Sequence, residues 1–96
     1  MPVVRSTLED AAYRAYVDHI AALRRKQGVT QVELAAKLGQ PQSFVSKTER
    51  YARRIDPAEF RAWVLAIGAD PAQEYAAVSL ALSVPTDEEL LAGDSL

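Results

Sequence analysis

Apolar residues recur at helical spacing in five stretches of the chain, and capping residues, glycine or proline mark the limits of each stretch. The first stretch runs from a capping box at Ser6–Glu9 to about Gln27, and Gly28 follows it where a helix can end. This pattern predicts one long first helix. Its expected inner face consists of Tyr16, Ile20 and Leu23.

The next stretch, over residues 30–50, reads as two short helices joined by a tight turn. Thr30 can cap the first of them together with Glu33, and Gly39 stands where a left-handed helix end favours glycine. Pro41 suits the first turn of the second helix, because a helix does not use the N–H of that position. The second helix is expected to turn Val45 inward and to carry a polar face of Gln42, Ser43, Ser46 and Lys47.

Two further helices are predicted, and each opens with an N-cap acid and a proline, at Asp56-Pro57 and at Asp70-Pro71. Gly68 ends the first, and Val84-Pro85 stops the second. Their inner faces should consist of Phe60, Trp63, Val64 and Ile67, and of Tyr75, Val78 and Leu82. The whole pattern predicts an all-α, five-helix bundle in one domain over residues 1–85. The acidic tail at residues 86–96 is expected either to fray or to form an arm that packs on a second subunit.

The central stretch resembles the helix-turn-helix of the phage-repressor-like (Cro/repressor, XRE) family of DNA-binding domains, over roughly residues 16–75. The matching positions are Gln31, Ala35, Gly39, Gln42, Ser43, Val45, Glu49 and Arg50. The resemblance implies a lambda-repressor-like bundle in which Arg24 pairs with Glu49 and joins the first helix to the third. Two positions depart from the family pattern. Thr48 replaces the usual Ile or Leu, which implies a weaker core contact, and Tyr51 replaces a common Gly, which implies a different turn after the recognition helix.

The net charge of −2 is unevenly distributed along the chain. Residues 1–23 sum to −1, residues 24–61 carry nine Lys or Arg against four Asp or Glu and sum to +5, and residues 62–96 sum to −6. The basic third coincides with the predicted helix-turn-helix. Since charge gathered on one face matters more for phosphate binding than the net charge does, this distribution favours a nucleic-acid partner.

DNA recognition requires side chains that reach base edges from the start of the second short helix, and others that hold phosphates. Gln42 can reach a base edge, where glutamine pairs in bidentate fashion with adenine. Gln31 is expected to meet a phosphate, and the resemblance implies that it also braces Gln42. Phe44 either lies against sugar–phosphate or a thymine methyl, or rests on Lys47 and the neighbouring helix. The expected DNA-binding residues are Gln31, Gln42, Ser43, Phe44, Ser46, Lys47, Arg50, Arg53 and Arg54.

The resemblance and the small size of the domain imply a homodimer on a palindromic double-stranded operator. The expected dimer interface consists of Tyr75, Val78, Leu80 and Leu82. The expected function is that of a sequence-specific transcriptional regulator, a dimeric repressor that occludes a promoter. One alternative is the antitoxin of a toxin–antitoxin pair, which binds a protein toxin and autoregulates its operon. Another is an interaction adaptor that has lost DNA binding, suggested only by Thr48 and Tyr51.

Catalysis, metal binding and membrane insertion find little support in the sequence. Cysteine is absent, so there is neither a disulfide frame nor a thiolate metal site. His19 is the only histidine, and the four glycines fall at predicted helix ends rather than in a phosphate loop. No apolar run approaches the roughly 20 residues that a membrane span needs. We therefore expect a cytoplasmic protein without a catalytic site or a cofactor.

Overall fold

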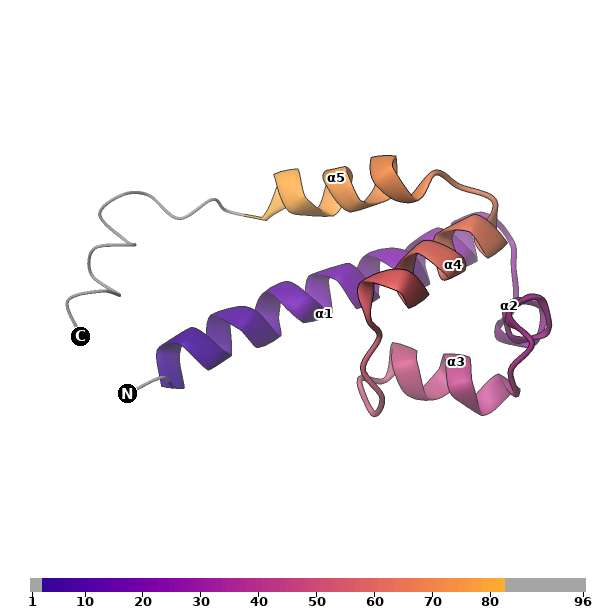
Figure 1. Ribbon diagram of the computed structural model, residues 1–96, viewed down its shortest axis with the longest axis horizontal. Coiled ribbons are helices and arrows are strands. Elements are labelled where there is room, and N and C mark those ends of the chain that lie inside the picture. The colour runs from indigo at the N-terminus through magenta and orange to yellow at the C-terminus, as the bar shows by residue number, and fades with distance from the viewer. Residues whose placement is uncertain (1–2, 83–96) are drawn as a thin grey trace.

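The computed structural model describes residues 3–82, which form five helices (Figure 1). The first helix is the longest, and the other four pack along it or near its C-terminal end. The predicted all-α, five-helix architecture is thereby confirmed. The predicted stop at Val84-Pro85 and the acidic tail lie outside the described residues. The helices are α1 (Val3–Lys26), α2 (Gln31–Leu38), α3 (Gln42–Glu49), α4 (Pro57–Ile67) and α5 (Pro71–Ala81).

Capping chemistry explains where most of these helices begin and end. The Thr30 side chain accepts from the Glu33 amide at 3.0 Å, and the Glu33 carboxylate accepts from the Thr30 amide at 2.9 Å. The same reciprocal box joins Asp56 to Glu59 at the start of α4. Gly39 ends α2 in the left-handed conformation with φ 66°, as expected. These local signals were sufficient to place α2, α4 and α5 from the sequence.

Two predicted helix starts are wrong. The first helix begins at Val3, so Ser6 lies inside it and does not open it. A capping box offers a start but does not stop a helix that can extend backwards, and Val3–Arg5 contain no proline or glycine. Pro41 is the residue before α3 and has φ −68° and ψ 157°. The proline ring fixes φ near a value that helical and extended backbone share. The ψ angle of 157° is that of extended backbone, so Pro41 precedes the helix and is not its first residue.

The hydrophobic core gathers side chains from four helices. It consists of Ile20, Leu34, Ala35, Val45, Phe60, Trp63, Val64 and Ile67, with Tyr16 and Leu23 partly buried against it. The predicted inner faces of α1 and α4 are therefore confirmed. Figure 1 shows α1 along the length of the molecule, with α5 along one side of it, α4 drawn across its C-terminal half, and α2 and α3 near its C-terminal end. The core thus contacts α3 on the face that carries Val45.

Thr48, which departs from the family pattern, is fully buried in this core. Its hydroxyl donates to the Phe44 carbonyl at 2.8 Å and accepts from the Arg53 guanidinium at 3.3 Å. A buried hydroxyl is costly only when it lacks a partner, and this one has two. Thr48 therefore supplies less apolar surface than Ile or Leu, yet it leaves no polar atom unsatisfied at that position.

Tyr51, the other departure, keeps a left-handed backbone with φ 63°, although glycine adopts that conformation far more easily. Contacts with α1 compensate for this strain. The Tyr51 hydroxyl donates to the Asp18 carboxylate, which raises the pKa of Tyr51, and the Arg14 guanidinium lies 4.8 Å from the ring centroid. The loop after α3 is therefore attached to α1 through side chains.

These opposing effects at Tyr51 can be separated by substitution. Tyr51→Ala removes the contacts but keeps a side chain in the left-handed region, whereas Tyr51→Gly removes both the contacts and the strain. Both variants should melt below the wild type, with the glycine variant roughly 4 °C or more above the alanine variant. Thermal unfolding followed by circular dichroism measures this order. An alanine variant as stable as the glycine variant would show that the backbone is not strained there.

Candidate nucleic-acid interface

The polar face of α3 is turned to solvent, and the opposite face is packed into the core. Gln42, Ser43 and Lys47 are exposed, Ser46 is half-buried, and Val45 is fully buried. The turn between the two helices contains Gly39 in the left-handed conformation and Pro41 in an extended one, and the burial of Val45 and Thr48 leaves the polar face of α3 turned outward. The arrangement presents hydrogen-bonding side chains from the N-terminal half of a helix, as DNA readout in the major groove requires.

A buried ion pair joins α1 to the C-terminal end of α3. The Arg24 Nε and Nη2 atoms donate to the two Glu49 carboxylate oxygens at 2.7 Å and 2.9 Å. The side chains of Arg24 and Glu49 are only 9% and 7% exposed. Arg24 also donates from Nη1 to the Val29 carbonyl at 2.9 Å, so the same guanidinium holds the turn that leads into α2. The structure therefore contains the pair that the resemblance implied.

A chain of hydrogen bonds continues from this ion pair to the surface. The Gln31 amide donates to Glu49 Oε1 at 3.0 Å, and the Gln42 amide donates to Gln31 Oε1 at 3.1 Å. The brace between the two glutamines was implied by the resemblance, but the link from Gln31 to Glu49 was not expected. Sequence spacing gives no signal for it, because it joins the start of α2 to the end of α3. Gln42 is thus both exposed and oriented.

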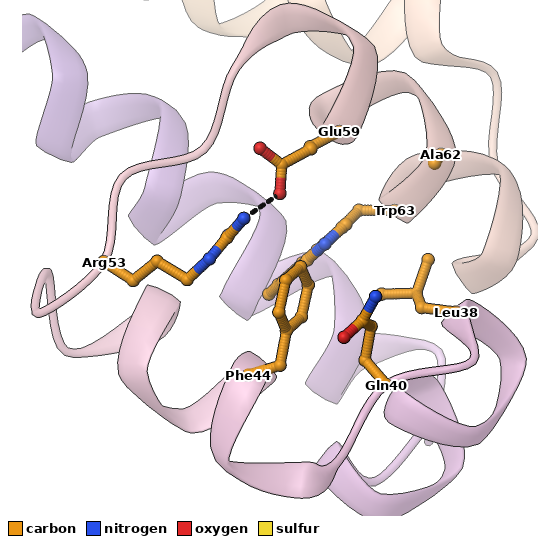
Figure 2. Close-up of a pocket in the computed structure, with 7 residues that line it drawn as sticks. All are labelled: Leu38, Gln40, Phe44, Arg53, Glu59, Ala62 and Trp63. Atoms are coloured by element: carbon orange, nitrogen blue, oxygen red, sulfur yellow. Dashed lines mark hydrogen bonds and ion pairs between the residues drawn. The ribbon is translucent and has the colours of Figure 1, made fainter.

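Phe44 and Arg53 pack against the protein itself (Figure 2). The ring centroids of Phe44 and of Trp63 on α4 are 6.3 Å apart, and the Arg53 guanidinium carbon lies 3.9 Å from the Phe44 ring centroid. Arg53 also forms an ion pair with Glu59. Of the two interpretations of Phe44, the structure has it resting on the neighbouring helix. The phosphate contact expected of Arg53 would compete with this ion pair to Glu59.

A hollow of about 250 Å³ lies between the ends of α2 and α3 and one side of α4. Figure 2 shows its lining, with the Arg53–Glu59 pair across one side and the indole of Trp63 near its centre. The buried indole Nε1 has no hydrogen-bond partner within the part of the chain that the structure describes. The lining residues are Leu38, Gln40, Phe44, Arg53, Glu59, Ala62 and Trp63. This hollow lies behind the recognition helix and not on its exposed face.

The remaining basic residues differ in how many contacts their side chains make within the protein. Arg50 is exposed and donates only to Ser46 Oγ at 3.3 Å, so it can still reach a phosphate. Arg54 lies 4.1 Å above the Tyr13 ring on α1 and 3.9 Å from Asp10, although its side chain is 69% exposed. Lys37 donates to the Ala66 carbonyl at 3.2 Å and so caps the end of α4. Within residues 10–82, Lys47 and Arg50 are the exposed cations carried by α3 and its C-terminal end, and neither forms an ion pair there.

The expected dimer residues on α5 do not share one surface. Val78 is 4% exposed, so it is buried within the single chain and is not available for an interface. Tyr75 is 54% exposed, but its ring stacks on Tyr16 with the centroids 5.1 Å apart. Leu80 is 83% exposed, and Leu82 is half-buried. Of these four residues, only Leu80 and the exposed part of the Tyr75 ring lie on the outer face of α5.

Residues 3–82 contain neither a candidate metal site nor a candidate membrane span. Among these residues no cluster of three or more His, Asp or Glu side chains could hold a metal ion. His19 contacts Glu74 on α5 at 2.8 Å and so takes part in helix packing. None of the helices in the described range is long and apolar enough to cross a membrane.

Comparison with known proteins agrees with this geometry. A family model described as helix-turn-helix matches residues 20–73 of the chain. Among solved structures, the chain is similar to an XRE-family like protein from Pseudomonas syringae pv. tomato str. DC3000, with 40% sequence identity and a TM-score of 0.79. The similarity covers 86% of this chain and 100% of that one. No curated protein shows a significant match.

The energetic role of the buried pair can be measured by substitution. Glu49→Ala should lower the free energy of unfolding by about 3–5 kcal/mol, because it leaves the Arg24 guanidinium buried without a counter-charge. The double variant Arg24→Met/Glu49→Leu should cost less than the sum of the single variants Arg24→Met and Glu49→Leu, since paired apolar side chains avoid the desolvation penalty. Urea unfolding followed by the fluorescence of the single tryptophan measures both. Additive losses would show that the two charges do not interact.

Proposed function

The chain belongs to the XRE-type helix-turn-helix family of DNA-binding transcriptional regulators, and from this premise we propose that it is a sequence-specific repressor that binds a palindromic operator as a homodimer. The observation that carries the proposal is the exposed Gln42 amide, which Gln31 holds in a defined orientation at 3.1 Å. A recognition helix reads bases with the side chains of its first turns. An oriented glutamine there can form two hydrogen bonds to one adenine.

The proposed contacts divide into base readout and phosphate binding. Gln42, Ser43 and Ser46 would face base edges, since they lie on the exposed polar side of α3. Gln31 would meet a phosphate at the N-terminus of α2, where free backbone N–H groups attract an anion. Lys47 and Arg50 would hold phosphates or a guanine further along the helix. Arg54, whose side chain is 69% exposed, would add a phosphate contact, whereas Arg53 would first have to give up its ion pair with Glu59.

Repression by occlusion is the mechanism that suits a domain of this kind. DNA occupied by the proposed dimer cannot be occupied by the transcription machinery at the same site. The charge distribution supports this mode of binding, because the basic residues gather in the helix-turn-helix portion and the acids gather beyond it. Localised positive charge strengthens binding at low salt and makes it depend on ionic strength.

The most direct functional test compares wild type and Gln42→Ala by fluorescence anisotropy on two labelled duplexes, at two salt concentrations. One duplex is taken from upstream of the protein's own gene, and the other is a scrambled version. Wild type should prefer the first, and Gln42→Ala should lose most of that preference, roughly fivefold or more, because it loses a bidentate base contact.

Arg50→Ala is the matched control. It should weaken binding to both duplexes alike and reduce the salt dependence by about one phosphate contact. If wild type binds neither duplex at low salt, the repressor proposal fails. A protein partner, such as the toxin of the antitoxin alternative, would then be sought.

The proposed dimer uses the outer face of α5. In support, Leu80 is the most exposed large apolar side chain of the described residues, and the only charged residue of α5, Glu74, is engaged with His19. A helix that is apolar on its exposed side gains stability by meeting a second copy across a two-fold axis. The proposal therefore centres on Leu80 and excludes Val78.

Leu80→Asp should convert the dimer into a monomer, because it would place two carboxylates near each other in an apolar interface. Size-exclusion chromatography with light scattering measures the mass directly. Leu65→Asp on α4 is the matched control, since Leu65 is also exposed, at 48%. It should leave the dimer intact. A wild-type monomer, or a Leu80→Asp dimer, would contradict the proposed interface.

A further inference from the structure

We propose that the hollow beside Trp63 is a binding site for a small aromatic carboxylate, held by the Trp63 indole N–H and the Arg53 guanidinium. The hollow has a volume of about 250 Å³ and combines residues of α2, α3 and α4 with Arg53 from the loop after α3. The inference goes beyond the proposed function and does not depend on it, because the hollow lies behind α3 and not on its exposed polar face. Its ligand would therefore occupy a different surface from DNA.

The Trp63 side chain supplies a hydrogen-bond donor that has no acceptor. Trp63 is 1% exposed, and its buried indole Nε1 has no hydrogen-bond partner within residues 3–82. Figure 2 shows this nitrogen between the Phe44 ring and the Arg53–Glu59 pair, all of which line the hollow. A buried donor without an acceptor costs free energy, and an oxygen atom of a ligand would recover that cost.

The Arg53 guanidinium supplies further donors on one side of the hollow. Its Nη1 atom donates to Thr48 Oγ1 at 3.3 Å, and its Nη2 atom forms the ion pair with Glu59. A guanidinium has more N–H groups than these two contacts use. The remaining N–H groups can bind a carboxylate, to which the planar fork of arginine is well matched.

The Glu59 carboxylate, which is the charged acceptor of the hollow, is engaged on both oxygens. It accepts from Arg53 through Oε2 and from the Asp56 amide at 3.3 Å through Oε1. The exposed Gln40 amide at the rim can donate as well as accept, so it favours neither kind of ligand. Because Arg53 neutralises Glu59, the excess of base over residues 24–61, which sum to +5, favours an anion over a cation.

The other walls of the hollow are apolar and suit an aromatic ring. They consist of Leu38, Phe44, Ala62 and the ring of Trp63. A cavity of roughly 150 Å³ admits benzene, so the hollow has room for one ring and its carboxylate. Since the indole nitrogen itself is buried, the ligand reaches it through a shift of the half-buried Phe44 or Arg53 side chain. Rotamer changes of this kind are common when a partner binds.

Two-dimensional NMR of the full chain tests the site directly, because the single tryptophan gives a single indole N–H signal. Benzoate is added to isotope-labelled protein, and benzamide and benzylamine serve as its neutral and cationic analogues. Benzoate should move the indole signal downfield and saturate with a dissociation constant on the order of 1 mM, since a ligand of so few atoms gains limited affinity. Benzamide should bind more weakly, and benzylamine should leave the signal unchanged.

Arg53→Gln should weaken benzoate binding roughly fivefold or more, because it removes the charge that pairs with the carboxylate. Arg61→Gln makes the same exchange at an exposed position of α4 that does not line the hollow, and it should keep the wild-type affinity. Ala62→Leu should abolish binding by filling the hollow. Leucine favours the helix and Ala62 is exposed, so this variant tests the site even if Arg53→Gln does not fold.

A saturable shift that Ala62→Leu abolishes and Arg61→Gln preserves supports the site. No movement of the indole signal with benzoate overturns the proposal, and so does wild-type affinity in Ala62→Leu. Equal binding of benzylamine also overturns it, because the rings alone would then account for the affinity. Equal losses in Arg53→Gln and Arg61→Gln overturn it as well, since they would show general attraction of an anion to a basic surface. These outcomes are independent of DNA binding, which the operator duplexes measure separately.

Discussion

The buried ion pair between Arg24 and Glu49 is the interaction on which the rest of the structure depends. It joins the last turn of α1 to the last turn of α3, and through the Val29 carbonyl it also holds the turn that precedes α2. A pair of this kind contributes little net stability, because its desolvation cost nearly offsets its attraction. Its value is geometric, since one guanidinium joins α1 both to α3 and to the turn that leads into α2.

The ion pair also links the interior to the candidate interface. The core packs against Val45 and Thr48 on the inner face of α3, and this packing determines which side chains face outward. Glu49 and Gln31 then orient the amide of Gln42 at the surface. Burial, charge and hydrogen-bond direction together give the exposed face of α3 a defined arrangement of polar side chains.

Much of this could be predicted from the sequence, because the signals are local. The capping boxes at Thr30 and Asp56, the left-handed Gly39 and the apolar spacing of α4 each involve residues within one helical turn. The start of α1 was misplaced, since nothing before Ser6 prevents the helix from extending. Capping residues indicate where a helix can begin or end, but they do not prevent the helix from extending past them.

Contacts between distant segments could not be predicted in this way. The position of Arg53 in the sequence indicates neither its ion pair with Glu59 nor its contact with the face of Phe44. Tyr51 was expected to alter a turn, whereas its bond to Asp18 supports the left-handed backbone that glycine would otherwise supply. In both cases a charged or aromatic side chain found a partner on another helix. Only the three-dimensional structure shows which partner is within reach.

We propose that one surface, the start of α2 and the outer face of α3, binds DNA and is held in place by the buried Arg24–Glu49 pair. Backbone amide shifts in two-dimensional NMR, recorded while an operator duplex is added, test this most directly. We expect the largest shifts at Gln31, Gln42, Ser43 and Ser46, with the outer face of α5 unchanged apart from dimer effects. Shifts confined to α5 or to the hollow beside Trp63, or no shifts at all, would contradict it.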